Sequence, residues 1–349
     1  MSTEFLARTH PDLACRAYSF RKVIEPLASV GYHVVAPDQR GYGRTIGSNG
    51  ASSFHMLNLV ADIVALVIAL GHNTVACVVG HDFGSPVAAY CALVRPDMFR
   101  SVILMSAPFP GPPSFPEPST LSSSWNASLP SPDVLAAQLA ALDPPRKHYQ
   151  HYFASPASHA NAHMLHAPQG LSAFLRAYYH MKSADWTQNK PHPLPSWSAS
   201  VLAQMPEYYI MDATKTMADT VAPHHPHKEP SWLSDTELAI YTAEFSRTTF
   251  QGGLNWYQFS MSGDLRVFSG MRITVPVLFI AGEKDWGMYQ IPGGMERMRV
   301  MCERMSTRDC CVVKGAGHWV QQERPDEVVR LITSFLTEHP ASDLLDDMI

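Results

Sequence analysis

The chain has 349 residues, a formal net charge of −5, and hydrophobic and charged fractions of 46% and 16%. This length holds one large α/β domain with an insertion or two smaller domains, and the apolar content excludes a largely disordered chain. Lysine and arginine form no long run, and Asp62 interrupts the longest apolar stretch, residues 57–70. We therefore expect neither a nucleic-acid partner nor a membrane span.

Three short runs in the first third of the chain predict buried parallel strands, because each is rich in β-branched residues and ends in turn residues. They are HVVAPD (33–38), TVACVVGHD (74–82) and SVILMSA (101–107). Helical patterns accompany them at residues 20–30, 54–70 and 85–94. This alternation predicts right-handed βαβ units and a mostly parallel sheet.

The alternation stops at residues 111–265, which are rich in Pro, Ser, His and aromatic residues and show helical stretches without obvious strands. It resumes with VPVLFIAGEKD (275–285), a helical pattern at 293–305, RDCCVVKGAG (308–317) and a closing helix at 325–336. We predict an α/β core made of residues 1–110 and 266–349, with helices on both faces of the sheet. The helical cap at 111–265 would form a lid, because ligands of open α/β sheets bind at the carboxyl ends of the strands.

The six cysteines lack the spacing of a metal site or a disulfide framework, and several lie in apolar patterns. Free, buried cysteines are typical of a reducing compartment. Residues 1–13 lack the charged start and apolar middle of a signal peptide, so we expect a soluble, cytoplasmic protein. The cluster HHPH (224–227) has no cysteine or carboxylate at ligand spacing and indicates a loop rather than a metal site.

The sequence GHDFG (80–84) begins at the end of the second predicted strand and precedes a predicted helix. A strand, a G-x-nucleophile-x-G turn and a helix form a nucleophile elbow, which exposes its central side chain at the carboxyl edge of the sheet. Many hydrolases have serine there, whereas this chain has Asp82. The positive end of the helix dipole would help to keep Asp82 ionised. A capping aspartate in a tight turn is the other interpretation, and the motif alone does not separate the two.

Two later strand ends carry the partners that such an elbow needs. Asp285 comes just past one strand in FIAGEKDW, and His318 comes just past the next in GAGHWVQQ. In folds with a nucleophile elbow, an acid and then a histidine follow the nucleophile in this order along the chain. Taken alone, His318 would more often be a structural histidine. As the third member of an ordered set, it is a candidate base.

A carboxylate is a poor nucleophile for acyl transfer and a good one for displacement at an sp³ carbon, where it forms an alkyl-enzyme ester. Water deprotonated by His318 would then attack the carbonyl carbon of Asp82, while Asp285 orients the imidazole. The backbone N–H of Phe83 is the expected oxyanion donor. A halide leaving group needs N–H donors, whereas an epoxide oxygen needs an acid such as tyrosine, with a pKa near ~10.

Seven stretches spread over residues 11–336 carry a family resemblance. They are VVAPDQRGYGRT (34–45), GHDFGSPVA (80–88), RKHYQHYFASP (146–156), APQGLSAFLRAYYHMKSADW (167–186), GGLNWYQ (252–258), GEKDW (282–286) and GHWVQQERP (317–325). With them the chain resembles the soluble epoxide hydrolases, a family of α/β hydrolases, and most of all the fungal members. The resemblance implies hydrolysis of a lipophilic epoxide to a vicinal diol, with no metal or organic cofactor, in fungal secondary metabolism or detoxification.

In that family two cap tyrosines hydrogen-bond the epoxide oxygen. One opens a Y-x-x-Y-F element and the other follows Asn-Trp, and the matching residues are Tyr149 and Tyr257. Ordinary aromatic packing is the alternative for each tyrosine taken separately. Tyr152, Trp286 and Trp319 are expected to line the substrate pocket, although each would also suit the core.

The N-terminus departs from the family pattern, in which two further strands precede a strand that ends in His-Gly-x-Pro. The residue before that proline donates the second oxyanion-hole N–H. Here the corresponding residues are RTHP (8–11). We therefore expect a weak strand before Arg8, without the first strands of the family pattern. His10 would be an imperfect donor to the oxyanion. An apparent truncation at this end would expose a sheet edge and favour association, for example as a homodimer.

Two other functions stay open at this point. A haloalkane-type dehalogenase would use the same triad, although the tyrosine pair argues against it. A degenerate, non-catalytic or ligand-binding paralogue would explain the incomplete oxyanion hole.

Overall fold

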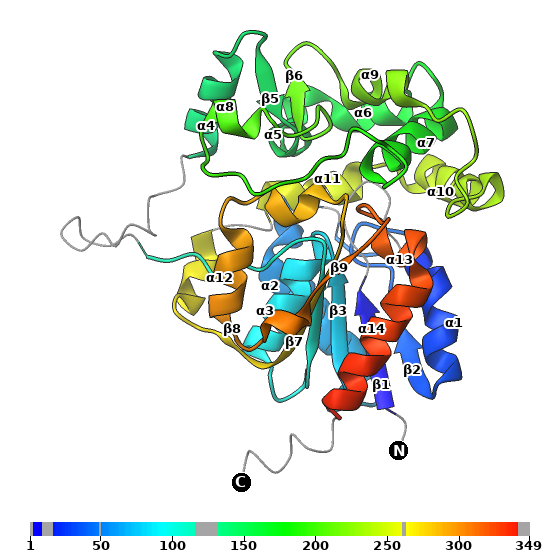
Figure 1. Ribbon diagram of the computed structural model, residues 1–349, viewed down its shortest axis with the longest axis vertical. Helices are drawn as coiled ribbons and strands as arrows, with labels where there is room; N and C mark the ends of the chain where they lie inside the picture. Colours follow the sequence, from blue (N-terminus) through cyan, green and yellow to red (C-terminus); the bar gives the residue numbers. More distant parts are fainter. Residues whose placement is uncertain (1–2, 9–16, 49, 116–130, 260–262, 341–349) are drawn as a thin grey trace.

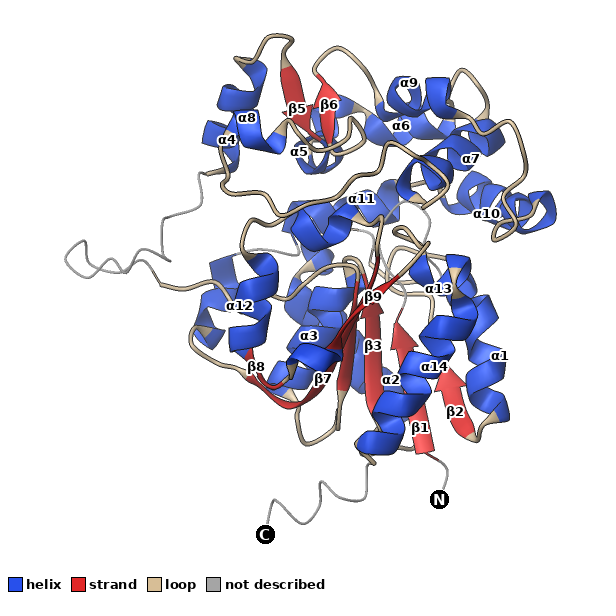
Figure 2. Ribbon diagram, viewed as in Figure 1, coloured by secondary structure: helices blue, strands red, loops and turns tan. Residues whose placement is uncertain are grey.

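The structure is a computed structural model, and it describes residues 3–8, 17–48, 50–115, 131–259 and 263–340. Two layers make up the molecule (Figure 1). A sheet flanked by helices forms the larger layer, and a mainly helical layer lies across the end of the sheet toward which its central strands point (Figure 2). This arrangement puts the helical layer over the carboxyl edge, where a ligand site is expected.

The larger layer is built on a seven-stranded sheet in the order β2-β1-β3-β4-β7-β8, with β9 also paired to β7. The strands are β1 (Thr3–Arg8), β2 (Tyr32–Val35), β3 (Cys77–His81), β4 (Val102–Met105), β7 (Ile273–Gly282), β8 (Cys302–Arg304) and β9 (Cys310–Val313). Every pairing in it is parallel. The strands therefore end at one common edge, and residues that directly follow them lie near one another.

Helices cover both faces of this sheet, as predicted (Figure 1). They are α1 (Arg21–Ser29), α2 (Met56–Ala69), α3 (Gly84–Val94), α12 (Gly294–Met301), α13 (Val320–Glu323) and α14 (Pro325–Glu338). Alternate strand residues face opposite sides, since Cys77 and Val79 pack with α1 and α14 while Val78 packs with α2 and α3. All five residues of β3 are buried, which is typical of a strand covered on both faces.

The helical layer is formed by segments between β4 and β7. Its helices are α4 (Pro132–Ala140), α5 (Tyr149–Ala154), α6 (Ala160–Leu165), α7 (Leu171–Lys182), α8 (Ala199–Leu202), α9 (Met217–Val221), α10 (Asp235–Thr248) and α11 (Gln251–Phe259). It also contains a two-stranded antiparallel sheet of β5 (Arg146–His148) and β6 (Ile210–Asp212). The sequence shows no obvious strands in this region, because three-residue strands are too short to produce a recognisable alternation.

Short 3₁₀ helices complete the description. They are η1 (Ala17–Phe20), η2 (Ala51–Phe54), η3 (Pro156–Ser158), η4 (Ala222–His224), η5 (Gly263–Phe268), η6 (Trp286–Tyr289) and η7 (Thr307–Asp309). Among the described residues, none of the helices combines the length and the apolar character that crossing a bilayer requires.

The strand expected before Arg8 is present as the six-residue β1, which pairs with β2 on one side and β3 on the other. One sequence prediction is wrong in its extent, because the helix expected at 293–305 ends at Met301 and β8 follows at once. The pairing of β8 with β7, which local sequence does not reveal, ends this helix early.

We expect Phe279→Ala to lower the free energy of unfolding by about 3–5 kcal/mol, because it leaves a cavity in the middle of β7. Phe279 is 0% exposed and belongs to the cluster packed against α2 and α3. Val312→Ala, on a strand residue that is 51% exposed, is the matched control and should cost less than about 1 kcal/mol. Urea denaturation measures both, and equal losses in the two variants would contradict this account of the core.

Candidate active site

The turn between β3 and α3 holds Asp82 in an uncommon backbone conformation, with φ of 51°. A Cβ atom at Gly80 would lie only 2.1 Å from the carbonyl oxygen of Gly84, so the turn requires glycine at that position. The Asp82 N–H donates to the Met105 carbonyl at 2.9 Å, and the Asp82 carbonyl accepts from the Ser85 N–H at 2.9 Å. The connection between β3 and α3 is therefore very short, and it presents the Asp82 side chain at the carboxyl edge of the sheet.

The three residues predicted to form a triad meet at this edge. His318 Nε2 lies 3.3 Å from Asp82 Oδ2, and His318 Nδ1 lies 3.1 Å from Asp285 Oδ1. Asp82 is 8% exposed, while Asp285 and His318 are each 1% exposed. One imidazole thus bridges two carboxylates, with the second held deep inside the protein.

The environment of Asp285 keeps this carboxyl group ionised. Burial alone would raise its pKa, but the charge of His318 and the hydrogen bonds from His318, Ser106 and the Gly287 N–H together hold the pKa below its ordinary value. The Gly287 N–H donates to Asp285 Oδ1 at 2.7 Å. An ionised Asp285 accepts from His318 Nδ1–H, which leaves Nε2 without a proton and able to act as a base.

Backbone contacts fix the loop that carries His318. The His318 N–H donates to the Lys182 carbonyl at 2.8 Å, and His81 Nε2–H donates to the His318 carbonyl at 2.7 Å. Glu323 accepts from the N–H groups of Gly317 and Trp319, each at 3.0 Å. Both neighbours of His318 are thereby held by one carboxylate.

Glu323 also joins the two layers of the molecule. Its carboxylate accepts from the Ala184 N–H at 2.8 Å, just beyond the end of α7. Burial raises the pKa of Glu323 to about 7, and the charge of Asp185 acts in the same direction, against three backbone N–H donors that lower it. No motif of its own marks Glu323 in the sequence, although the residue lies within GHWVQQERP.

The two predicted acid tyrosines lie side by side in the helical layer, and one of them contacts the elbow. Tyr149 opens α5 and Tyr257 lies in α11, and their ring centroids are 6.0 Å apart at an interplanar angle of 77°. The ring of Tyr257 meets the ring of Phe83, directly after Asp82, edge to face at 5.5 Å. The ring of Tyr257 therefore lies against the residue that follows Asp82, and the ring of Tyr149 lies against that of Tyr257.

A chain of polar groups engages the Tyr149 hydroxyl. It donates to Gln290 Oε1 at 2.8 Å and accepts from Gln150 Nε2 at 3.2 Å. Gln290 Nε2 donates in turn to the Tyr209 hydroxyl at 3.2 Å, and burial raises the pKa of Tyr209 well above its ordinary value. Gln290 and Tyr209 were not expected from the sequence, because no motif marks either residue.

The remaining predicted residues occupy different surroundings. Trp319 is 0% exposed, and its ring meets that of His318 at 4.6 Å, beside the triad. Trp286 follows Asp285 and is buried against His192, with ring centroids 5.0 Å apart. The Tyr152 hydroxyl contacts His163 Nδ1 at 3.2 Å, inside the helical layer. His10 lies outside the described residues.

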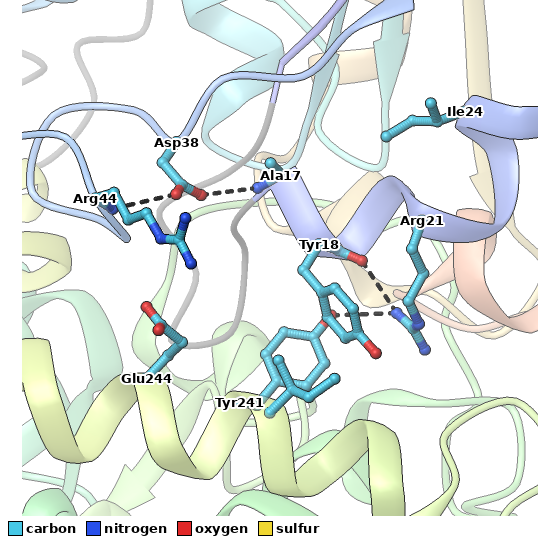
Figure 3. Close-up of a pocket in the computed structure, with 9 residues that line it drawn as sticks. Ala17, Tyr18, Arg21, Ile24, Asp38, Arg44, Tyr241 and Glu244 are labelled. Carbon is cyan, nitrogen blue, oxygen red and sulfur yellow. Dashed lines mark hydrogen bonds between the residues drawn. The ribbon is translucent and has the colours of Figure 1, made fainter. Parts of the chain in front are cut away.

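A separate recess of about 390 Å³ opens between η1, α1 and α10 (Figure 3). Figure 3 shows Arg21 donating to the Tyr18 carbonyl and the Tyr241 hydroxyl within it, at 3.2 and 3.4 Å. Among the residues that the structure describes, its lining includes none of the predicted site residues. Likewise, the described part of the chain has no group of His, Cys, Asp and Glu arranged to hold a metal ion.

A parallel sheet with a nucleophile elbow, and an acid and a histidine at two later strand ends, defines the α/β-hydrolase class. Residues 13–132 match the family model described as alpha/beta hydrolase fold. Epoxide hydrolases B and A of Mycobacterium tuberculosis are 31% and 32% identical to the chain, over 91% and 95% of its length and 87% and 89% of theirs.

Solved structures agree with this likeness. An epoxide hydrolase from an endophytic Streptomyces superposes with a TM-score of 0.75 at 30% identity, covering 96% of this chain and 89% of the other. Epoxide hydrolase A from Mycobacterium thermoresistibile gives a TM-score of 0.73 at 29% identity, with coverages of 96% and 91%. The chain belongs to the epoxide hydrolase family of α/β hydrolases.

The raised pKa of Glu323 predicts a specific dependence of stability on pH. Because its pKa is about 7 in the folded protein and 4.5 ordinarily, the native state binds a proton that the unfolded chain has released between those values. The free energy of unfolding should then fall by roughly 1–3 kcal/mol from this group as pH rises from ~4.5 to ~7. Glu323→Gln should remove that part of the slope in urea denaturation between pH 4 and 8. A variant with the wild-type slope would contradict the assignment.

Proposed function

We propose that the protein hydrolyses a lipophilic epoxide to a vicinal diol through an ester of Asp82. The observation that carries this proposal is the placement of Asp82 at the elbow, 3.3 Å from a His318 nitrogen, with Tyr257 of the Tyr149–Tyr257 pair packed on the adjacent Phe83. A carboxylate nucleophile, a base and two weak acids are the groups that opening an epoxide ring and hydrolysing the resulting ester require. Membership of the epoxide hydrolase family supports the same reaction.

In the first step, an Asp82 carboxylate oxygen forms a bond to one ring carbon, and the bond from that carbon to the epoxide oxygen breaks. The oxygen takes a proton from Tyr149 or Tyr257, which becomes a tyrosinate. The product of this step is a neutral β-hydroxy ester of Asp82. Two tyrosines suit this task because their ordinary pKa near ~10 keeps them protonated at neutral pH and still acidic enough to donate.

In the second step, His318 Nε2 takes a proton from water, and the hydroxide oxygen bonds to the carbonyl carbon of Asp82. The Phe83 N–H stabilises the oxyanion, and Asp285 stabilises the imidazolium. When the ester bond breaks, the diol oxygen takes the proton from His318. The remaining proton of the new carboxylic acid restores the tyrosine, which leaves Asp82 ionised for another turnover.

A lipophilic substrate fits the character of the layer above the triad. A buried cluster of that layer contains many aromatic side chains, among them Phe153, Tyr178 and Trp186, and Tyr257 packs against it. We assign the lid to residues 111–265, whose helices carry both acids. A cytoplasmic setting in secondary metabolism or detoxification, and a homodimer, stay predictions from the sequence.

Asp82→Ala should abolish diol formation, with a loss of at least about 10⁴-fold in kcat, because no other group can form the ester. A single turnover of the wild-type enzyme in ¹⁸O-water should place the label in the Asp82 carboxylate, since water attacks the ester carbonyl. Mass spectrometry of the peptide that contains Asp82 measures this. Labelled diol from an unlabelled enzyme would contradict the ester mechanism.

Removing the acids should slow ring opening rather than ester hydrolysis. Tyr149→Phe and Tyr257→Phe should each lower the rate of enzyme alkylation by about 10–100-fold, and the double variant by about 10²–10⁴-fold. Tyr152→Phe is the matched control, because its hydroxyl contacts His163 inside the helical layer. Rapid-quench measurement of ester formation tests all four variants, and a similar loss in Tyr152→Phe would argue against the assignment of the pair.

A further inference from the structure

We infer that Ser106 is a positioning residue for His318 in the ester-hydrolysis step, an inference that rests on the proposed function. Ser106 directly follows β4, the strand between the elbow strand β3 and the strand β7 that leads to Asp285. It is 0% exposed, and its Oγ lies 3.1 Å from His318 Nδ1. Asp285 Oδ1 lies at the same distance of 3.1 Å from that nitrogen. The imidazole is therefore held by two side chains, Ser106 after β4 and Asp285 after β7.

The backbone of Ser106 is built to bring the hydroxyl to this place. Its φ is 69°, in the left-handed region that residues other than glycine rarely occupy. Its N–H donates to the Ile280 carbonyl in β7 at 2.9 Å, which ties the strained residue to the adjacent strand. Strain of this kind persists where the surrounding structure determines the conformation, and it is concentrated at functional sites.

Gly287 leaves the space that the hydroxyl occupies. A Cβ atom at Gly287 would lie 2.3 Å from Ser106 Oγ and 2.9 Å from Asp285 Oδ1. The same residue donates its N–H to Asp285, so its backbone supports the carboxylate while the missing side chain makes room for the serine. Ser106, His318 and Asp285 thus form one closely packed group.

The chemistry of this group follows from its hydrogen bonds. Ser106 also faces the Asp285 carboxyl group and helps to lower the pKa of Asp285. With the tautomer that keeps Nε2 free to take a proton, the serine oxygen accepts from His318 Nδ1–H. A hydroxyl oxygen can accept one hydrogen bond and donate another through the same atom. It restrains rotation of the ring and keeps Nε2 directed at Asp82.

Only one half-reaction needs this restraint. Ring opening uses Asp82 and the tyrosines, whereas ester hydrolysis uses His318 as the base. Loss of the Ser106 hydroxyl should therefore leave enzyme alkylation within about twofold of the wild-type rate. It should slow ester hydrolysis by about tenfold, the equivalent of one neutral hydrogen bond, so that the ester accumulates in the steady state.

Two substitutions separate the hydroxyl from the backbone. Ser106→Ala removes the oxygen and keeps a residue for which this φ is strained, whereas Ser106→Gly removes the oxygen and relieves the strain. We expect both variants to slow hydrolysis by a similar factor, and Ser106→Gly to unfold at a higher temperature than Ser106→Ala. Ser101→Ala is the matched control, because Ser101 is equally buried at the other end of β4 and donates to the Ala76 carbonyl at 2.7 Å.

The experiment measures alkylation and ester hydrolysis of styrene oxide separately, by rapid quench in single turnovers, together with the melting temperature of each variant. Slower hydrolysis in both Ser106 variants, with normal alkylation and an unaffected Ser101→Ala enzyme, supports the inference. Hydrolysis at the wild-type rate in Ser106→Gly, or an equal loss in both half-reactions, overturns it. Absence of any Asp82 ester in the wild-type enzyme would instead refute the proposed function itself.

Discussion

The site depends on the close approach of two backbone segments at the end of β3. Gly80 and Gly84 come so near that no side chain fits at Gly80, and this contact lets the strand turn into α3 within two residues. The turn forces Asp82 to a φ of 51° and sends its side chain out at the carboxyl edge of the sheet. Since every strand of this sheet runs parallel, the edge that receives Asp82 also receives the residues after β4, β7 and β9.

The helical layer does more than cover this edge. Its backbone carbonyl groups at Lys182 and Tyr179 accept from the His318 N–H and from Trp319 Nε1, at 2.8 and 2.9 Å. Glu323 binds N–H groups from both layers, and Gln290 joins Tyr149 to the core. The base and one acid are thus held by contacts that cross between the layers, so the geometry of the triad and the seating of the helical layer depend on each other.

The spacing of motifs predicted the parallel sheet. It also singled out Asp82, Asp285 and His318, which lie together at the carboxyl edge of that sheet. The reason is that parallel topology places strand ends together, so position along the chain translates into position at the site. Ser106 also lies at the end of a predicted strand, SVILMSA (101–107), and the same rule would have marked it. A serine in that place has no motif of its own, and its role becomes visible only through a φ of 69° and a distance of 3.1 Å to His318.

The sequence by itself determined the α/β class, the elbow at Asp82, and the order of the acid and the histidine, because these follow from local periodicity and short motifs. Tertiary structure alone decided that β1 pairs with a strand on each side, that Glu323 and Ser106 support the segment of His318, and that Gln290 engages Tyr149. Each of these depends on atoms from residues distant in the chain, as with Ser106 and His318 or Tyr149 and Gln290. The local sequence pattern does not reveal such contacts, because packing and hydrogen bonding between distant elements create them.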